Sequence, residues 1–131
     1  MRLLLVRHAD ALPGEPDELR RLSSEGHSAA RALGERLARE GIRPSAILTS
    51  PLLRARETGE MLAAALGCPS EPHEALAPGA TAAGVRDAVA DRGETVIAVG
   101  HQPDCGRIAT ELGDGIEPKF PPAGVVELEL R

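Results

Sequence analysis

The stretch Thr95-Val96-Ile97-Ala98-Val99-Gly100-His101 is a continuous apolar run that ends in a glycine and a histidine. A short run without polar residues predicts a strand that is buried on both faces, as in the middle of a parallel sheet. Two similar runs occur earlier in the chain. Leu3-Leu4-Leu5-Val6 leads into Arg7-His8, and Ala46-Ile47-Leu48 leads into Thr49-Ser50. These strands predict an α/β sheet with polar residues where each strand ends.

Helical segments separate the predicted strands. Ser23 or Ser24 is suited to cap the first helix, which is expected to reach about Glu40, with Gly41 as its stop signal. Pro51 is expected to open the second, because proline is tolerated in the first turn. Loops are predicted for the Gly- and Pro-rich parts of the chain. The expected helices cover residues 24–40, 51–67, 81–92 and 103–112, and the expected loops cover 9–22 and 113–124.

The remaining segments complete the predicted sheet. A weak strand is expected near residues 70–73. In residues 126–130, apolar side chains alternate with Glu127 and Glu129, which predicts a half-exposed strand at an antiparallel edge. Strands that alternate with helices favour a three-layer α/β fold. We therefore expect a mostly parallel central sheet with helices on both faces, in a single domain over residues 1–131.

The composition limits the classes of function. The chain has 131 residues, 42% of them hydrophobic, a single aromatic residue (Phe120) and a formal net charge of −5. Nucleic-acid binding is not expected, because a basic patch and aromatic stacking residues are both lacking. No apolar run approaches the ~18–20 residues of a membrane span. Cys68 and Cys105 are expected to be reduced thiols, and a soluble cytoplasmic protein is the default expectation.

Charged and polar residues follow three of the predicted strands. The first strand delivers Arg7 and His8, the second leads through Ser50 to Arg54, and the strand at 95–99 delivers His101. The carboxyl ends of parallel strands meet at one edge of the sheet, where ligands bind in open α/β folds. Guanidinium groups match phosphoryl oxygens, and an imidazole can attack phosphorus. The pattern favours a phosphoryl-binding site.

The same residues resemble a known family. Leu5-Val6-Arg7-His8-Ala9 resembles the R-H-G signature of the histidine phosphatase superfamily, also called the phosphoglycerate mutase-like fold. Residues 49–58, TSPLLRARET, are similar to its S-x-x-x-R-A-x-x-T block, and Gly100-His101 resembles its second catalytic histidine. The resemblance covers essentially the whole chain in order. The compact length resembles the SixA-type phosphohistidine phosphatases.

The resemblance implies a mechanism and a set of site residues. His8 would attack phosphorus and become phosphohistidine, which water would then hydrolyse. Arg7, Arg54 and His101 would bind the equatorial oxygens of the phosphoryl group, without a metal or other cofactor. Arg20-Arg21-Leu22-Ser23 is similar to the R-P-L-T segment of SixA-type proteins, so Arg20 would be a further phosphate ligand, with Arg21 as the alternative.

The sequence departs from the family pattern at two points. Ala9 stands where the family has glycine, so the nucleophile loop must accommodate a Cβ. The inserted region that carries the general acid in larger relatives is absent. Glu74 is the first candidate for this acid and Asp10 the second. Because a P–N leaving group protonates readily, the missing insertion favours phosphohistidine or phosphoramidate substrates.

Three functions remain open on the sequence. The first is a phosphohistidine phosphatase, acting on a phosphorylated protein or a phosphoramidate. The second is a small-molecule phosphomonoester phosphatase of the same superfamily. The third is a non-catalytic phosphate-binding module, which would have no use for His8 as a nucleophile. Ser50 and Thr58 are interpreted as a cap and a packing hydroxyl, and residues 15–18 as a solvated acidic loop. Cys105 is interpreted as a structural thiol, with an oxidisable thiol near His101 as the less favoured alternative.

Overall fold

A computed structural model describes all 131 residues and contains one five-stranded sheet with the strand order β3-β2-β4-β1-β5. All neighbouring strands are parallel except β1 and β5, which are antiparallel. The predicted α/β fold with an antiparallel edge strand is therefore confirmed. The strands are β1 (Arg2–Arg7), β2 (Ala46–Thr49), β3 (Ser70–Pro72), β4 (Thr95–Gly100) and β5 (Val125–Glu129).

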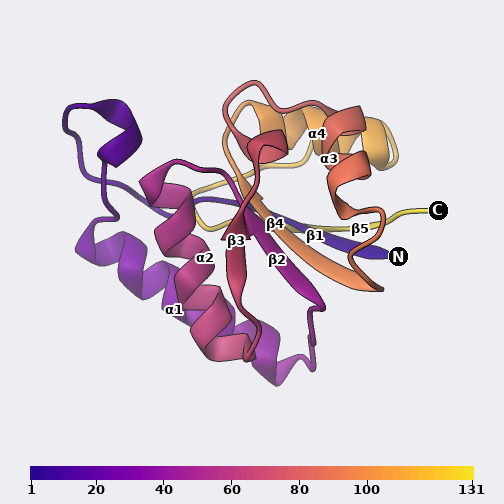
Figure 1. Ribbon diagram of the computed structural model, residues 1–131, viewed down its shortest axis with the longest axis horizontal. Coiled ribbons are helices and arrows are strands. Elements are labelled where there is room, and N and C mark those ends of the chain that lie inside the picture. Colours follow the sequence, from indigo (N-terminus) through magenta and orange to yellow (C-terminus); the bar gives the residue numbers. More distant parts are fainter.

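Helices cover both faces of the sheet (Figure 1). On one face, Leu4 and Val6 of β1 pack into the core beneath the first two helices of the chain. On the opposite face, Leu3 and Leu5 pack into the core beneath the last two. This alternation follows from the period of two along a strand, and it explains why residues 3–6 of β1 are all apolar. None of the helices combines the length and hydropathy of a bilayer-spanning segment. The first face carries α1 (Ser24–Arg39) and α2 (Leu53–Leu66), and the second carries α3 (Ala82–Val89) and α4 (Asp104–Leu112).

The helix boundaries differ from the prediction in two places. Pro51 does not open α2, because the hydroxyl of Ser50 accepts a hydrogen bond from the backbone N–H of Leu52 at 3.2 Å. Leu52 is thereby kept extended, with φ −67° and ψ 141°, and the helix begins at Leu53. The third helix ends at Val89, three residues before the predicted end at 92. Within the predicted loop 9–22, the structure adds a short 3₁₀ helix, η1 (Asp17–Leu19).

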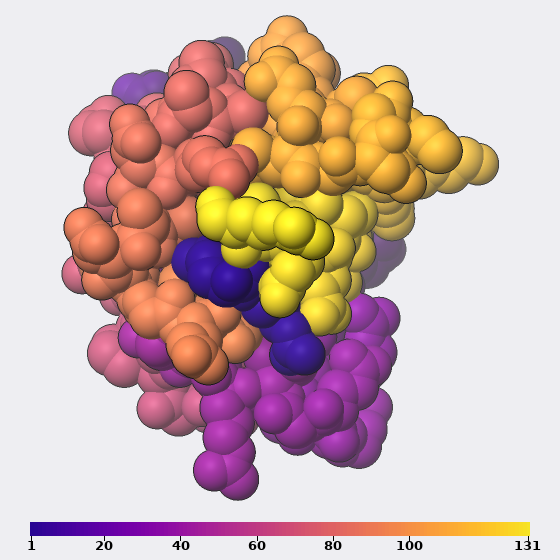
Figure 2. Space-filling model, turned by 90° about the vertical axis from the view of Figure 1, so that its right-hand side faces the viewer, coloured from indigo at the N-terminus to yellow at the C-terminus, as the bar shows by residue number.

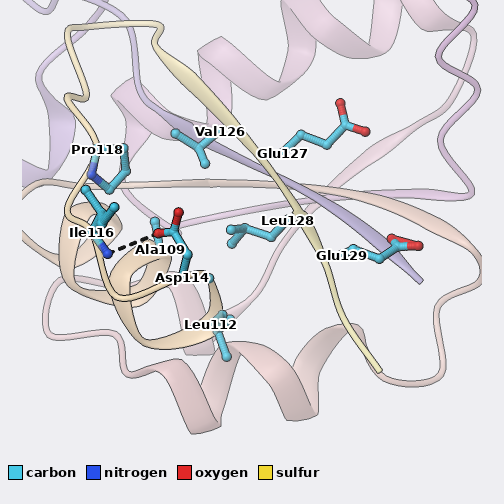
Figure 3. Close-up of a pocket in the computed structure, with 10 residues that line it drawn as sticks. Ala109, Leu112, Asp114, Ile116, Pro118, Val126, Glu127, Leu128 and Glu129 are labelled. Carbon is cyan, nitrogen blue, oxygen red and sulfur yellow. Dashed lines mark hydrogen bonds between the residues drawn. The ribbon is translucent and has the colours of Figure 1, made fainter.

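The two ends of the chain lie next to each other, because the first strand β1 pairs with the last strand β5. The Met1 amino group donates a hydrogen bond to the Leu130 carbonyl at 2.9 Å, and the Leu130 N–H donates to the Met1 carbonyl at 2.7 Å. The indigo N-terminal and yellow C-terminal residues accordingly lie side by side (Figure 2). A groove of about 500 Å³ lies between β5, the end of α4 and residues 113–118. Val126 and Leu128 point into it, and it runs beside the first half of β1, away from the carboxyl ends of the parallel strands (Figure 3).

A glycine sets the distance between α2 and the sheet. A Cβ on Gly59 would overlap the side-chain methyl group Cγ2 of Thr49, at the end of β2. Both residues are buried. Close approach of the helix therefore depends on the missing side chain, and α2 is the helix that carries Arg54 near its first turn.

We predict that Gly59→Ala lowers the free energy of unfolding by about 1–3 kcal/mol, the usual cost of overpacking. Alanine is otherwise the better helix former, so the sign of the change tests the close contact. Urea denaturation followed by circular dichroism measures it. Adding Thr49→Ser removes the obstructing methyl group and keeps the hydroxyl, so the double variant should recover at least half of the loss. Equal stability of the wild type and the Gly59→Ala variant would contradict the prediction.

Candidate active site

The carboxyl ends of the three central strands meet at one pocket of about 340 Å³. The backbone pairing continues past the strands, because His8 N–H donates to the Gly100 carbonyl at 3.0 Å and Ser50 N–H donates to the Val99 carbonyl at 2.9 Å. The residues after β1, β2 and β4 are thus fixed relative to one another. The lining consists of Arg7, His8, Asp10, Ala11, Asp17, Arg20, Arg54, Pro78, His101, Gln102 and Pro122.

The imidazole of His8 is oriented by the backbone. Its Nδ1 lies 2.8 Å from the carbonyl oxygen of Ala9. A carbonyl oxygen can only accept, so the proton of the neutral ring is on Nδ1 and the Nε2 lone pair is free. The Ala9 N–H donates to Oγ1 of Thr58 at 3.0 Å, and this hydroxyl donates to the Arg54 carbonyl at 2.8 Å. The nucleophile loop and α2 are therefore connected by hydrogen bonds.

The imidazole of His101 lies beside that of His8, with 5.1 Å between the ring centroids. His101 is only 5% exposed. Its Nε2 lies 2.7 Å from Oγ of Ser50, the residue that follows β2. The contact with Ser50 fixes the orientation of the ring, so two histidines from neighbouring strands share the pocket.

Two of the arginines have guanidinium groups with an unused donor. Nη1 of Arg7 donates to the carbonyl oxygen of Phe120, the sole aromatic residue, at 2.9 Å. Arg54 is 7% exposed, and its Nη1 donates to the carbonyl oxygen of Asp17 at 2.9 Å. The Nε atoms of both Arg7 and Arg54 are buried and have no hydrogen-bond acceptor. Because buried donors are costly to leave unpaired, this pattern is typical of a site that binds an anion.

A third arginine borders the pocket from the loop before α1. Nε of Arg20 donates to the Leu12 carbonyl at 2.8 Å, and its Nη1 lies 3.2 Å from Oδ1 of Asp17. The other carboxylate oxygen of Asp17 lies 3.2 Å from Nη2 of Arg54. One carboxylate thus connects two guanidinium groups at the rim of the pocket.

Burial and positive neighbours lower the pKa values of both histidines. Desolvation lowers the pKa of His8 below 6.5, the hydrogen bond to Ala9 opposes this shift, and the charges of Arg54, Arg7 and Arg20 add to it. Desolvation, then the proximity of His8 and the charge of Arg54, lower the pKa of His101 to about 4. Both rings are therefore neutral at pH 7. The Asp17 carboxyl has a lowered pKa, chiefly because it accepts hydrogen bonds from Arg20 and Arg54.

The pocket brings together most of the residues that the sequence analysis singled out. Arg7, His8, Arg54 and His101 all line it. Of the two competing arginines, Arg20 lines the pocket, and Arg21 does not.

The two candidates for a general acid are placed differently. Glu74 lines a separate hollow of about 190 Å³ beside residues 75–84 and is not part of the pocket lining. Asp10 does line the pocket, and its Oδ2 accepts a hydrogen bond from the Ser23 hydroxyl at 2.7 Å. No group of three or more His, Cys, Asp and Glu side chains in the structure could hold a metal ion.

Cys105 lies outside the pocket lining, and desolvation raises the pKa of its buried thiol to about 12. A thiol that stays protonated is a weak nucleophile and is not readily oxidised.

Sequence reasoning missed the site contacts of three residues. Asp17 was expected to belong to a solvated acidic loop, yet it contacts two of the arginines. Ser50 was interpreted as a cap, and it does bind the Leu52 N–H, but it also contacts His101. Gln102 lines the pocket directly after His101. The spacing Asp17-x-x-Arg20 was the one available signal, because residues three apart in a helical turn can form an ion pair.

Comparisons with known proteins agree with this geometry. A model of the histidine phosphatase superfamily (branch 1) matches residues 3–78. An uncharacterized protein of Picosynechococcus sp. (strain ATCC 27264 / PCC 7002 / PR-6) is 38% identical over an alignment of 123 residues, and the match covers 88% of this chain and 74% of that protein.

Solved structures of SixA proteins are also similar. The protein histidine phosphatase SixA complexed with tungstate is 26% identical, with a TM-score of 0.88, and the match covers 97% of this chain and 86% of that one. A structure from Agrobacterium tumefaciens, assigned as a SixA phosphohistidine phosphatase, is 27% identical with a TM-score of 0.83, covering 96% and 89% of the two chains. This protein therefore belongs to the histidine phosphatase superfamily, and it is a phosphatase.

Proposed function

We propose that this protein hydrolyses phosphohistidine, or a related phosphoramidate, with His8 as the nucleophile. The observation that carries the proposal is the state of the His8 ring. Its Nδ1 proton faces the Ala9 carbonyl and its pKa is lowered, so the unprotonated Nε2 is available at pH 7. The ring lies in a pocket with the guanidinium groups of Arg7 and Arg54, each of which has a buried, unpaired Nε–H.

The proposed reaction has two transfers. In the first, the His8 Nε2 lone pair forms a bond to phosphorus, the P–N bond of the substrate breaks, and the leaving imidazole takes a proton from the solvent. In the second, water attacks the phosphorus of phospho-His8, the new P–N bond breaks, and inorganic phosphate leaves. Arg7, Arg54, Arg20 and His101 bind the non-reacting oxygens. Such positioned donors account for most of the catalysis in phosphoryl transfer.

The carboxylates in the pocket support a substrate with a P–N bond. An alkoxide leaving group needs a proton from a general acid, whereas an imidazole nitrogen protonates readily. Asp17 is paired with two arginines, which lower the pKa of its carboxyl group and make it a poor proton donor. Asp10 already accepts a hydrogen bond from the Ser23 hydroxyl. Glu74 lies outside the pocket lining. A small-molecule phosphomonoester remains the second candidate, and it would require Asp10 to act as the acid.

We further propose that the substrate is a phosphorylated protein and that the enzyme acts in the cytoplasm. The pocket opens at the end of the sheet without an inserted segment over it, so a histidine side chain on another protein can reach it. Both cysteines are free thiols, as is usual in a reducing compartment. SixA structures, which this chain resembles, bear the name protein histidine phosphatase or phosphohistidine phosphatase.

We predict that the enzyme becomes transiently phosphorylated on His8. Rapid quenching during turnover of a radiolabelled histidine-phosphorylated protein should trap a label that is labile in acid and stable in alkali. The His8→Ala variant should carry no label and should lose substrate hydrolysis by at least about two orders of magnitude. His27→Ala, a control on α1 outside the pocket, should behave as the wild type. An acid-stable label, or full turnover by His8→Ala, would contradict the proposed chemistry.

We also predict that both pocket histidines titrate at low pH. Their lowered pKa values mean that the neutral rings persist as the pH falls through 6.5. An NMR titration of the ring C–H resonances should give a midpoint of about 4 for His101 and below 6.5 for His8. In His8→Ala the His101 midpoint should rise, because the repulsion between the two rings is removed. A His8 midpoint at or above 6.5 would refute the prediction.

A further inference from the structure

Asp17 is a carboxylate in a pocket for anions. Its backbone carbonyl accepts from Nη1 of Arg54, and its two carboxylate oxygens lie 3.2 Å from Arg54 and 3.2 Å from Arg20. The Arg54 side chain is 9% exposed, whereas that of Asp17 is 59% exposed. The carboxylate therefore lies at the rim, between the buried guanidinium group and the solvent. The reaction proposed above assigns no role to it.

The charges of the pocket indicate what this carboxylate does. Arg7, Arg20 and Arg54 bring three positive charges to the lining, and both histidines are neutral at pH 7. A bound phosphoryl dianion offsets two of these charges, and the carboxylate of Asp17 offsets the third. Asp10 adds a further negative charge beside the nucleophile. The loaded pocket thus has no positive charge left to attract a second anionic group of the substrate.

The loop that carries Asp17 presents both acidic and apolar groups to the solvent. Glu15 and Glu18 flank Asp17 and are exposed. Leu12 and Leu19 of the same loop are 46% and 56% exposed, and only one other large hydrophobic residue, on a different loop, is exposed to this degree. A surface of this kind, bordering the catalytic pocket, fits a basic and partly apolar protein segment.

We propose that Asp17 determines specificity by charge, so that the enzyme selects a phosphohistidine flanked by basic residues and disfavours one flanked by acidic residues. The inference rests on the proposed function, because it concerns the substrate of the same site. Asp17 acts on the neighbourhood of the phosphoryl group rather than on the reacting atoms. Substitution of Asp17 should therefore change the ratio of the kcat/KM values for two substrates, and not only the rate on one of them.

Two phosphohistidine peptides of the same length, one with lysine and one with glutamate on either side, test the proposal. The wild type should have a kcat/KM about tenfold higher on the lysine peptide, as expected for several charge pairs near a protein surface. Asp17→Asn should reduce this preference about fivefold, whatever it does to the absolute rates. Glu18→Gln is the matched control, because it removes the same charge from the next residue, which is outside the pocket lining. It should change the preference less than about twofold.

Each alternative outcome overturns the inference. Equal rates of the wild type on both peptides would show that charge does not select the substrate. A lower rate of Asp17→Asn with an unchanged ratio would show that Asp17 only positions the arginines. An equal effect of Glu18→Gln would show that the preference comes from the negative charge of the whole loop and not from Asp17 itself. Failure of the proposed function is distinguishable, because neither peptide would then be hydrolysed through phospho-His8.

Discussion

The site depends on the parallel pairing of β1 with β4 and of β4 with β2. Arg7 is aligned with Gly100, and Thr49 with Val99, so the next residues along the three strands emerge at the same level of the sheet. A shift of one residue would turn His8 to the opposite face. The fully buried side chains on both faces of these strands fix the register. The 5.1 Å separation of the two imidazole rings is thus a consequence of packing in the core.

Burial affects the protonation of arginine and of histidine differently in this pocket. Arginine stays protonated when it is buried, whereas burial next to arginine drives histidine to the neutral form. The same enclosed space therefore supplies fixed positive charge and an unprotonated nucleophile at neutral pH. The unpaired Nε atoms of Arg7 and Arg54 are costly in the folded chain. A phosphoryl group would remove that cost by accepting hydrogen bonds from these donors. Donors that have no acceptor in the protein alone are thus available to the ligand.

The sheet and the ends of its strands could be predicted from the sequence, because a continuous apolar run and the residue that follows it are local features. His8 and His101 are such residues, and their shared edge follows from the parallel topology. The contacts of Asp17 could not be predicted, since they depend on how a loop folds back over α2. The position of Glu74 outside the pocket could not be predicted either, because it depends on where the segment after β3 lies in the fold. The start of α2 was also missed, because the Ser50 hydroxyl accepts a hydrogen bond from the Leu52 N–H and the helix begins after Leu52 rather than at Pro51.

The alanine after the nucleophile shows how this site accommodates a departure from the family pattern. Ala9 is fully buried, and its side chain packs with Leu22 and Ala30 in a small apolar cluster beneath the loop. Its N–H is used by Thr58 and its carbonyl by His8, so the backbone has the contacts that orient the imidazole whichever small side chain is present. The Cβ therefore adds buried contact without altering the hydrogen bonds. The tautomer of His8 depends on the position of the Ala9 carbonyl, and α2, through Thr58, fixes that position.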